Sequence, residues 1–225
     1  MSSGELRFAL PGGAQALFTA RVAGNMSSVA GEGAEDAQHA RERLRAQIGV
    51  DRLARGYQVH GTVVEHLKRP REPGAQGRHA DGQATALSGV GAMVLTADCL
   101  PVALASTGAV AMVHAGWRGL AAGVLESGVQ ALQELGGEGE IVAVIGPGAG
   151  ACCYEVGPEI HAIFGDGDRD GTRIDLRAIA RGRLLAAGVA DVLDVEACTI
   201  CDVRFFSHRR EGARAGRQAG VAWRS

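Results

Sequence analysis

The chain lacks several features that mark whole classes of protein. Its 23 lysine and arginine residues nearly balance 25 acidic residues, so no strong net field would attract nucleic acid or an anionic membrane. No stretch approaches the roughly 20 apolar residues of a membrane-spanning helix. No repeat period is visible along the chain. These absences exclude nucleic acid and membrane as expected partners and favour a small molecule.

The chain also lacks the marks of an exported protein. Residues Met1 to Glu5 carry no cationic segment followed by an apolar run, which a secretory signal would have. The five cysteines are an odd number, unlike the even framework of a small disulfide-rich protein. We therefore expect a cytoplasmic protein whose cysteines are free thiols or metal ligands. Its oligomeric state is left open.

What the sequence does contain is typical of one globular domain, which we expect to span 1–225. Hydrophobic residues make up 46% of the chain, and 34 glycines indicate many tight turns. Short apolar runs, expected as buried strands, lie at 92–96, 102–105, 110–113 and 141–145. Helices are expected at 34–48, at 120–135 and from the capping Asp175 to Gly188. The stretch 68–82, with Pro70 and Pro73, is typical of an exposed loop. The predicted fold class is α+β, a mixed α/β single domain.

Strand register brings a cysteine and a histidine together. A glycine-containing turn after Ala105 makes that residue face Val110 in an antiparallel hairpin, and Pro101 then faces His114. Cys99 lies just beyond the same open end of the hairpin. Either residue alone would usually be an ordinary part of the core. As a pair they predict a thiolate and an imidazole that share one metal ion.

A third ligand must come from elsewhere in the chain. His60 is the best candidate, because it lies at an expected strand end and is followed by a glycine. Four other histidines lie in a charged helix, in the loop or beside surface residues: His39, His79, His66 and His161. The predicted metal ligands are therefore His60, Cys99 and His114.

The residues after His114 predict an anion site. Glycines at 116 and 119 allow a sharp turn into a helix and leave Arg118 near its positive end. The alternative is an ordinary solvated charge.

Two other cysteine features are interpreted as separate from the metal site. Cys198 and Cys201 have the spacing of a redox or zinc pair, but a structural zinc needs two more ligands, and a redox pair normally opens a helix. The adjacent Cys152 and Cys153 are interpreted as a packed turn.

Several blocks of the sequence form a known family pattern. They include Gln58-Val59-His60-Gly61, Asp81-Gly82 with Thr85, Thr96-Ala97-Asp98-Cys99 before Pro101-Val102, and the run from His114 to Gly119. Further blocks are Ile145-Gly146-Pro147, Cys153-Tyr154-Glu155-Val156-Gly157, and Phe206-Ser207 with Arg209-Arg210. From Gln58 to Trp223 the sequence resembles the bacterial multicopper polyphenol oxidoreductase or laccase-domain family, whose members are also described as purine nucleoside phosphorylases.

The resemblance implies mixed β-sheets packed between helices, and a zinc ion held by His60, Cys99 and His114. Family enzymes are assigned phosphorolysis of adenosine, inosine and S-methyl-5'-thioadenosine, with deamination of adenosine, so the implied partners are a purine nucleoside and phosphate. A laccase needs several copper ions and many histidines, and this chain has seven. One zinc ion is the expected cofactor, and copper is the less expected alternative.

Roles for other residues follow from this chemistry. Two imidazoles and one thiolate leave a fourth zinc position for water, whose pKa a catalytic zinc lowers to about 7. Deamination also needs an acid/base group, for which Asp98 is the candidate, with a structural role equally open. Phosphorolysis needs cations around phosphate. Arg118 is predicted to act in catalysis, and Arg209, Arg210 and Arg41 to bind substrate.

Other function classes remain open. Some relatives are described as peptidoglycan editing factors, which would make the protein a hydrolase of faulty cell-wall precursors. A copper-dependent polyphenol oxidase is another alternative. A non-catalytic zinc module would need a fourth ligand, for which the sequence offers no obvious candidate.

Overall fold

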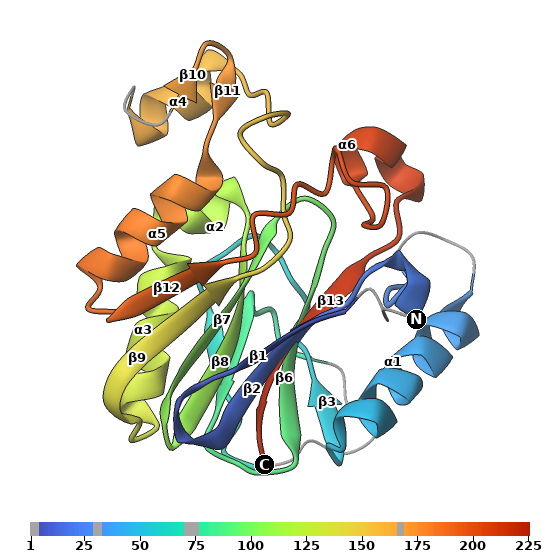
Figure 1. Cartoon of the computed structure of the whole chain (residues 1–225), viewed down its shortest axis with the longest axis vertical. Coiled ribbons are helices and arrows are strands. Elements are labelled where there is room, and N and C mark those ends of the chain that lie inside the picture. Colours follow the sequence, from blue (N-terminus) through green and yellow to red (C-terminus); the bar gives the residue numbers. More distant parts are fainter. Residues whose placement is uncertain (1–4, 29–32, 70–76, 166–168) are drawn as a thin grey trace.

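Two β-sheets pack face to face in a computed structural model that describes residues 5–28, 33–69, 77–165 and 169–225 (Figure 1). The five-stranded sheet has the order β1 (Leu6–Ala9), β2 (Ala14–Phe18), β13 (Gln218–Arg224), β6 (Val90–Thr96) and β3 (Arg52–Ala54). The six-stranded sheet has the order β12 (Asp191–Asp194), β9 (Glu138–Ile145), β7 (Leu100–Thr107), β8 (Ala109–Ala115), β5 (Gly82–Thr85) and β4 (Val64–His66). Both sheets are mixed, because β3–β6, β12–β9 and β4–β5 are parallel pairs and the other neighbours are antiparallel.

Helices cover the outer faces of the two sheets (Figure 1). Helix α1 (Ala34–Ile48) packs on the five-stranded sheet through Ala40, Leu44 and Ile48. The outer face of the six-stranded sheet is covered by α2 (Trp117–Ala122), α3 (Val124–Glu134) and α5 (Leu176–Ala186), whereas α4 (Pro158–Phe164) lies beyond the end of the sheet and packs on α2 (Figure 1). The remaining elements are α6 (His208–Glu211), the short β10 (Arg169–Asp170) and β11 (Arg173–Ile174), and three 3-10 turns, η1 (Pro11–Gly13), η2 (Arg21–Ala23) and η3 (Gly212–Arg214). The expected arrangement of mixed sheets between helices is confirmed.

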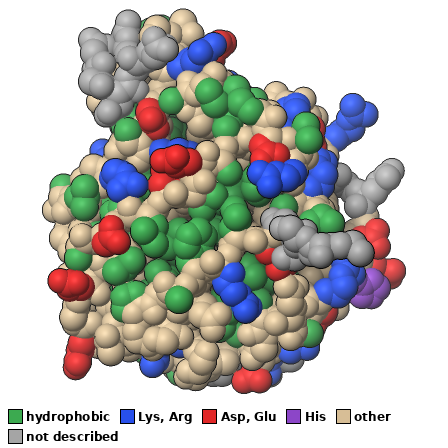
Figure 2. Space-filling view, in the orientation of Figure 1, with side chains coloured by type: hydrophobic (Ala, Val, Ile, Leu, Met, Phe, Trp, Pro, Cys, Tyr) green, Lys and Arg blue, Asp and Glu red, His purple; other side chains and the backbone are tan. Residues whose placement is uncertain are grey.

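The central strands are buried on both faces. In β7, Val102 and Leu104 pack toward the helices, whereas Ala103 and Ala105 pack toward the other sheet. This two-sided burial explains why the segment is a continuous apolar run without polar alternation. Small side chains are frequent between the sheets, among them Ala14, Ala16, Ala92, Ala103, Ala105 and Ala222. Near the centre of the face seen in Figure 2, hydrophobic side chains gather and charged ones lie around them.

Several element predictions are confirmed and one is wrong. The helix at 34–48 and the cap of α5 are as expected, since the Asp175 carboxylate accepts the N–H groups of Arg177 and Ala178. The predicted helix at 120–135 is divided, because Gly123 lies in the left-handed region with a φ of 99° and separates α2 from α3. The predicted loop at 68–82 falls partly outside the described residues, and it ends where β5 begins.

The connection between the sheets is short. Residues Ala97 to Cys99 join the end of β6 in one sheet to the start of β7 in the other. This connection positions Asp98 and Cys99 at the boundary of the two sheets. No helix among the described residues is long and apolar enough to cross a membrane.

Candidate metal centre

Three possible metal ligands meet at one end of the six-stranded sheet. Their ligand atoms, from His60, Cys99 and His114, all lie within 4.8 Å of one another. The Cys99 Sγ is 3.8 Å from the His60 Nε2, and the two imidazole rings lie edge to face with centroids 4.9 Å apart. A tetrahedral zinc with ordinary bond lengths would hold sulfur and nitrogen ligands about 3.6 Å apart. The group therefore fits a metal ion.

The hairpin places two of these ligands as expected. Pro101 pairs with His114 and Ala105 with Val110 in the antiparallel β7–β8 ladder. Cys99 precedes the first residue of β7 and therefore lies at the same end as His114. The predicted strand register is confirmed.

His60 reaches the group from a loop and not from a strand end, so the local prediction was wrong. The residue lies between β3 and β4, in the left-handed region with a φ of 60°. The Asp81 carboxylate accepts the backbone N–H groups of Val59 (3.1 Å), His60 (2.9 Å) and Gly61 (2.7 Å). These three bonds hold a backbone conformation that a residue with a side chain rarely adopts.

Asp81 also orients the second histidine. Its Oδ1 lies 2.8 Å from the His114 Nδ1, which leaves the His114 Nε2 free to face a metal. Asp81 is fully buried, and the pKa of its carboxyl is held below its usual value because the bonds from His114 and the backbone outweigh the effect of burial. Sequence reasoning quoted Asp81 in a family block but gave it no role. One carboxylate fixes both histidines.

Two glycines leave the space that the group occupies. A side-chain carbon at Gly116 would lie 2.8 Å from the His60 Cδ2 and 3.0 Å from the Cys99 Sγ. One at Gly119 would lie 2.9 Å from the carbonyl oxygen of Gly61. The 2.8 Å and 2.9 Å distances are shorter than side-chain carbons tolerate, so these glycines allow the His60 loop to approach α2.

The ligands carry complementary charges before a metal binds. The pKa of Cys99 is lowered to about 6, because the attraction of His114 and the hydrogen bonds from both histidines outweigh burial. The pKa of His114 is raised to about 9, because its attraction to Cys99 and Asp81 and its hydrogen bonds with them outweigh the effect of burial. A thiolate and an imidazolium therefore face one another at neutral pH.

These pKa values predict how metal affinity depends on pH. Between pH 6 and 9 a metal must displace one proton, that of His114, so affinity is expected to rise about tenfold per pH unit. Below pH 6 the dependence steepens, because Cys99 also holds a proton. Competition with a chromophoric chelator from pH 6.5 to 8.5 measures this slope. An affinity that does not change with pH would contradict the thiolate–imidazolium pair.

Asp98 lies beside the metal group, and each of its carboxylate oxygens accepts a hydrogen bond. Its Oδ1 accepts the Thr199 hydroxyl (2.7 Å) and its Oδ2 accepts the backbone N–H of Arg209 (2.7 Å). The residue is 7% exposed and has a φ of 89°. These contacts favour the structural alternative, in which Asp98 joins the sheet boundary to the turn at Thr199 and the start of α6.

Arg209 and Tyr154 lie together near the metal ligands. The Arg209 guanidinium stacks on the Tyr154 ring at 4.8 Å and donates to the Glu155 carbonyl (2.8 Å). Burial raises the pKa of Tyr154, and the charge of the nearby Cys99 raises it further. Tyr154 is therefore a neutral hydroxyl beside the centre.

The other predicted arginines lie in different settings. Arg118 is exposed and stacks on Trp117 at 4.4 Å, two residues beyond Gly116. The Arg210 guanidinium is occupied by backbone carbonyls, including those of Thr199 (2.7 Å) and Phe205 (2.5 Å). It also pairs with Glu211 at 2.7 Å. These contacts are typical of a scaffold residue, and a role of Arg210 in substrate binding stays a prediction.

Arg41 lies on α1, on the outer side of the other sheet. It donates to the Met26 carbonyl (2.6 Å), and burial, with the charge of Arg55, lowers its pKa. None of its described contacts joins it to the metal group. A role in substrate binding stays a prediction.

The structure also brings together two cysteine pairs that sequence reasoning kept apart. Cys152 and Cys153 lie against Cys198 and Cys201, with the four sulfur atoms within 4.8 Å of one another. The expectation that the Cys198 pair lacks two further thiols is therefore wrong. The pairs are too distant in sequence for spacing alone to reveal the contact.

Known proteins resemble the chain over almost its whole length. A family model described as multi-copper polyphenol oxidoreductase laccase matches residues 14–225. A purine nucleoside phosphorylase of Xylella fastidiosa is 38% identical over 237 residues, covering 95% of this chain and 88% of that protein. One of Corynebacterium glutamicum is 32% identical over 230 residues, covering 92% of this chain and 93% of that protein.

Solved structures agree with these sequence matches. The crystal structure of YlmD from Geobacillus stearothermophilus superposes with a TM-score of 0.89 at 29% identity, covering 100% of this chain and 97% of that one. Protein NMB0706 of Neisseria meningitidis has a TM-score of 0.83 at 30% identity, covering 99% of both chains. The match over residues 14–225 and the similarity to these relatives show that the chain belongs to the multi-copper polyphenol oxidoreductase laccase family.

Proposed function

We propose that the protein is a zinc-dependent purine nucleoside phosphorylase that acts on adenosine, inosine and S-methyl-5'-thioadenosine and also deaminates adenosine. The observation that carries the proposal is the three-ligand group of His60, Cys99 and His114, in which His114 is buried and His60 is exposed. A substrate can approach such a group from the side of His60. The relatives at 32% and 38% identity are named purine nucleoside phosphorylases, which supports the same activity.

The donor set favours a single zinc ion over a copper oxidase. Two imidazoles and a thiolate suit a catalytic zinc, which supplies Lewis acidity and leaves one coordination position open. Among the described residues, the only other cluster of three or more possible ligands consists of cysteines, without histidine. A group of coppers with several histidine ligands has no counterpart there.

The chain's own residues supply orientation and charge. Asp81 holds the His114 ring by its Nδ1 and fixes the His60 loop, so both imidazoles are positioned before substrate arrives. Arg209 and Arg118 are the cations proposed to bind phosphate, and neither shows an ion pair among the described contacts.

The Tyr154 ring is proposed to contact the purine or ribose. Its raised pKa keeps the hydroxyl protonated at neutral pH, so it can donate a hydrogen bond beside the metal group. Asp98 is not proposed as the acid/base group, because both of its carboxylate oxygens already accept hydrogen bonds.

Incubation of zinc-loaded protein with adenosine tests the proposal. With phosphate we expect adenine and ribose 1-phosphate, and without phosphate we expect inosine from deamination. Removal of the metal with a chelator should abolish both reactions, and added zinc should restore them.

The other function classes are outcomes of the same experiment. If the protein releases no purine base from adenosine, inosine or S-methyl-5'-thioadenosine and forms no inosine from adenosine, the purine assignment is contradicted. Oxidation of a phenol by copper-loaded protein would favour the oxidase instead. Hydrolysis of a peptidoglycan precursor, with no reaction of nucleosides, would favour the editing hydrolase.

A further inference from the structure

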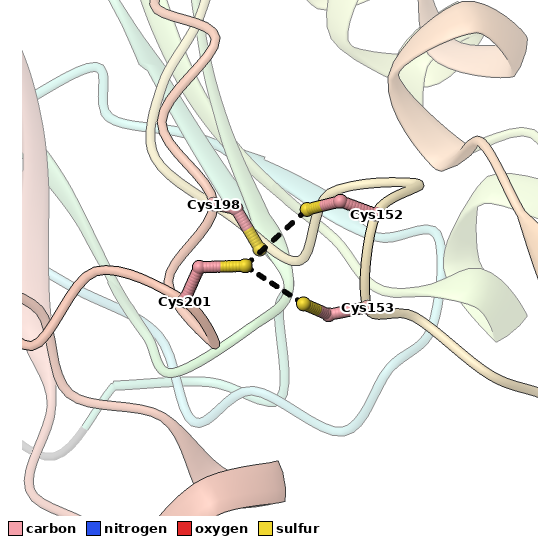
Figure 3. Close-up of side chains that lie close together, drawn as sticks. All are labelled: Cys152, Cys153, Cys198 and Cys201. Atoms are coloured by element: carbon pink, nitrogen blue, oxygen red, sulfur yellow. Dashed lines mark hydrogen bonds between the residues drawn. The ribbon is translucent and has the colours of Figure 1, made fainter.

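Four cysteines gather on two neighbouring turns, apart from the His60, Cys99 and His114 group. Figure 3 shows Cys152 and Cys153 on one turn with their sulfurs directed at Cys198 and Cys201 on the other. The Cys201 Sγ lies 3.4 Å from that of Cys152 and 2.7 Å from that of Cys153. All four cysteines are free, and the four sulfur atoms lie within 4.8 Å of one another.

Backbone hydrogen bonds hold the two turns together. Gly148 and Cys198 form a parallel bridge, in which the Thr199 N–H donates to the Gly148 carbonyl at 3.0 Å. The Gly148 N–H donates in turn to the Ala197 carbonyl at 3.2 Å. Each turn also has a backbone hydrogen bond of its own: the Cys153 N–H donates to the Gly150 carbonyl, and the Asp202 N–H donates to the Cys198 carbonyl. The backbone therefore places the thiols together without help from the sulfurs.

The surroundings of the sulfurs resemble those of metal-bound thiolates. The Gly150 N–H donates to the Cys198 Sγ at 3.2 Å, and ligand atoms of metal sites commonly receive such bonds. A side-chain carbon at Gly150 would lie 3.0 Å from the Cys198 Cβ and 3.4 Å from the Cys152 Sγ. The glycine thus leaves room for the sulfurs to converge.

We infer that Cys152, Cys153, Cys198 and Cys201 form a second metal site that binds one zinc ion through four thiolates. Zinc bonds of about 2.3 Å place tetrahedral sulfurs about 3.8 Å apart. The Cys201–Cys152 sulfur distance of 3.4 Å is close to this value, whereas the Cys201–Cys153 distance of 2.7 Å is shorter, so these two sulfurs would move apart as the ion binds. Four protein ligands fill a tetrahedral shell, so the site is structural and leaves no position for substrate. Thiolates select zinc over hard cations, and one divalent ion offsets the mutual repulsion of the four sulfurs. A single disulfide would use only two of them.

The zinc would fix the wall of the first centre. The turn of Cys198 carries Thr199, whose hydroxyl bonds to Asp98, the neighbour of Cys99. The turn of Cys153 carries Tyr154, on which Arg209 stacks. The second site therefore joins the two segments that hold Asp98 and Tyr154 in place. This inference does not depend on the proposed function.

Metal counting in matched variants tests the inference. Protein purified under reducing conditions and loaded with zinc is expected to hold two zinc ions per chain by elemental analysis. Cys201→Ser, which changes an exposed residue, should hold one, as should His60→Ala, and the double variant none. The retained first zinc in Cys201→Ser shows that its fold is intact, so each site serves as the control for the other.

Cobalt substitution of the wild-type protein gives a second measurement that needs no variant. Four thiolates give several times the sulfur-to-cobalt charge-transfer absorption of one, so filling the second site should raise the near-ultraviolet band severalfold. One zinc per wild-type chain, unchanged in Cys201→Ser, would overturn the inference. So would a wild-type protein that holds iron in the cysteine cluster, or one whose mass shows a disulfide there after zinc loading.

Discussion

His114→Ala is expected to abolish metal binding at the centre of His60, Cys99 and His114 and to lower the free energy of unfolding by about 2–4 kcal/mol in the metal-free protein. His114 is 3% exposed, and its Nδ1 bonds to Asp81, which is fully buried. Without the imidazole, the Asp81 carboxylate keeps its three backbone donors but loses its only described charged partner. Urea unfolding and elemental analysis measure the two effects.

His60→Ala is the matched control for this stability effect. It removes a ligand from the same group and should also abolish binding at this centre, but the His60 side chain is exposed and does not bond to Asp81. The expected loss of stability is below about 1 kcal/mol. Equal destabilisation in both variants would contradict the role given to Asp81. Zinc retained at this centre in both would disprove the ligand assignment.

Gly116→Ala is expected to reduce metal affinity at this centre by about 10- to 100-fold while the protein remains folded. The added carbon would lie 2.8 Å from the His60 ring and 3.0 Å from the Cys99 sulfur, so the ligands must move apart. Gly116 has a φ of −77°, which alanine adopts without strain. The effect is therefore steric and local, and chelator competition measures it.

Gly182→Ala provides the matched control. Gly182 lies within α5, and apart from its chain neighbours and the backbone of its own helix no described atom lies within 4 Å of the position of an added side-chain carbon. Alanine there should leave metal affinity unchanged and raise stability by about 0.5–1 kcal/mol. If Gly116→Ala bound zinc as tightly as Gly182→Ala, the close approach at Gly116 would have no functional meaning.

The parts of the site that sequence could predict are those fixed by neighbouring residues. Cys99 and His114 belong to one hairpin, whose turn determines that Pro101 pairs with His114. The cap at Asp175 is likewise a local interaction. For such features, the spacing of residues along the sequence determines how far apart they lie in the structure.

The parts that sequence could not predict depend on contacts between distant segments. The His60 loop is held by Asp81, a distant residue. The left-handed backbone of His60 has no signature in the sequence, because the residues before Gly61 are typical of the end of a strand. Asp98 could be assigned a structural role only once Thr199 and Arg209 were seen to bond to it. The division between α2 and α3 at Gly123 was missed because apolar spacing continues across it.

The cysteine pairs show the same limit. The spacing of Cys198 and Cys201 supplies only two of the four ligands of a structural zinc, and the adjacent Cys152 and Cys153 lie in position to supply the other two. The parallel bridge between Gly148 and Cys198 brings them together. Since this bridge lies outside the named strands, periodicity of the sequence does not indicate it.

The three-residue connection from β6 to β7 makes the first centre sensitive to how the two sheets are packed. Cys99 lies where the chain passes from one sheet to the other, whereas His114 belongs wholly to the six-stranded sheet. Any sliding of one sheet over the other changes the distance from sulfur to imidazole. Alanines between the sheets, such as Ala103, are remote from the chemistry but help to set that distance. Substitutions that enlarge them would therefore change metal affinity without touching a ligand.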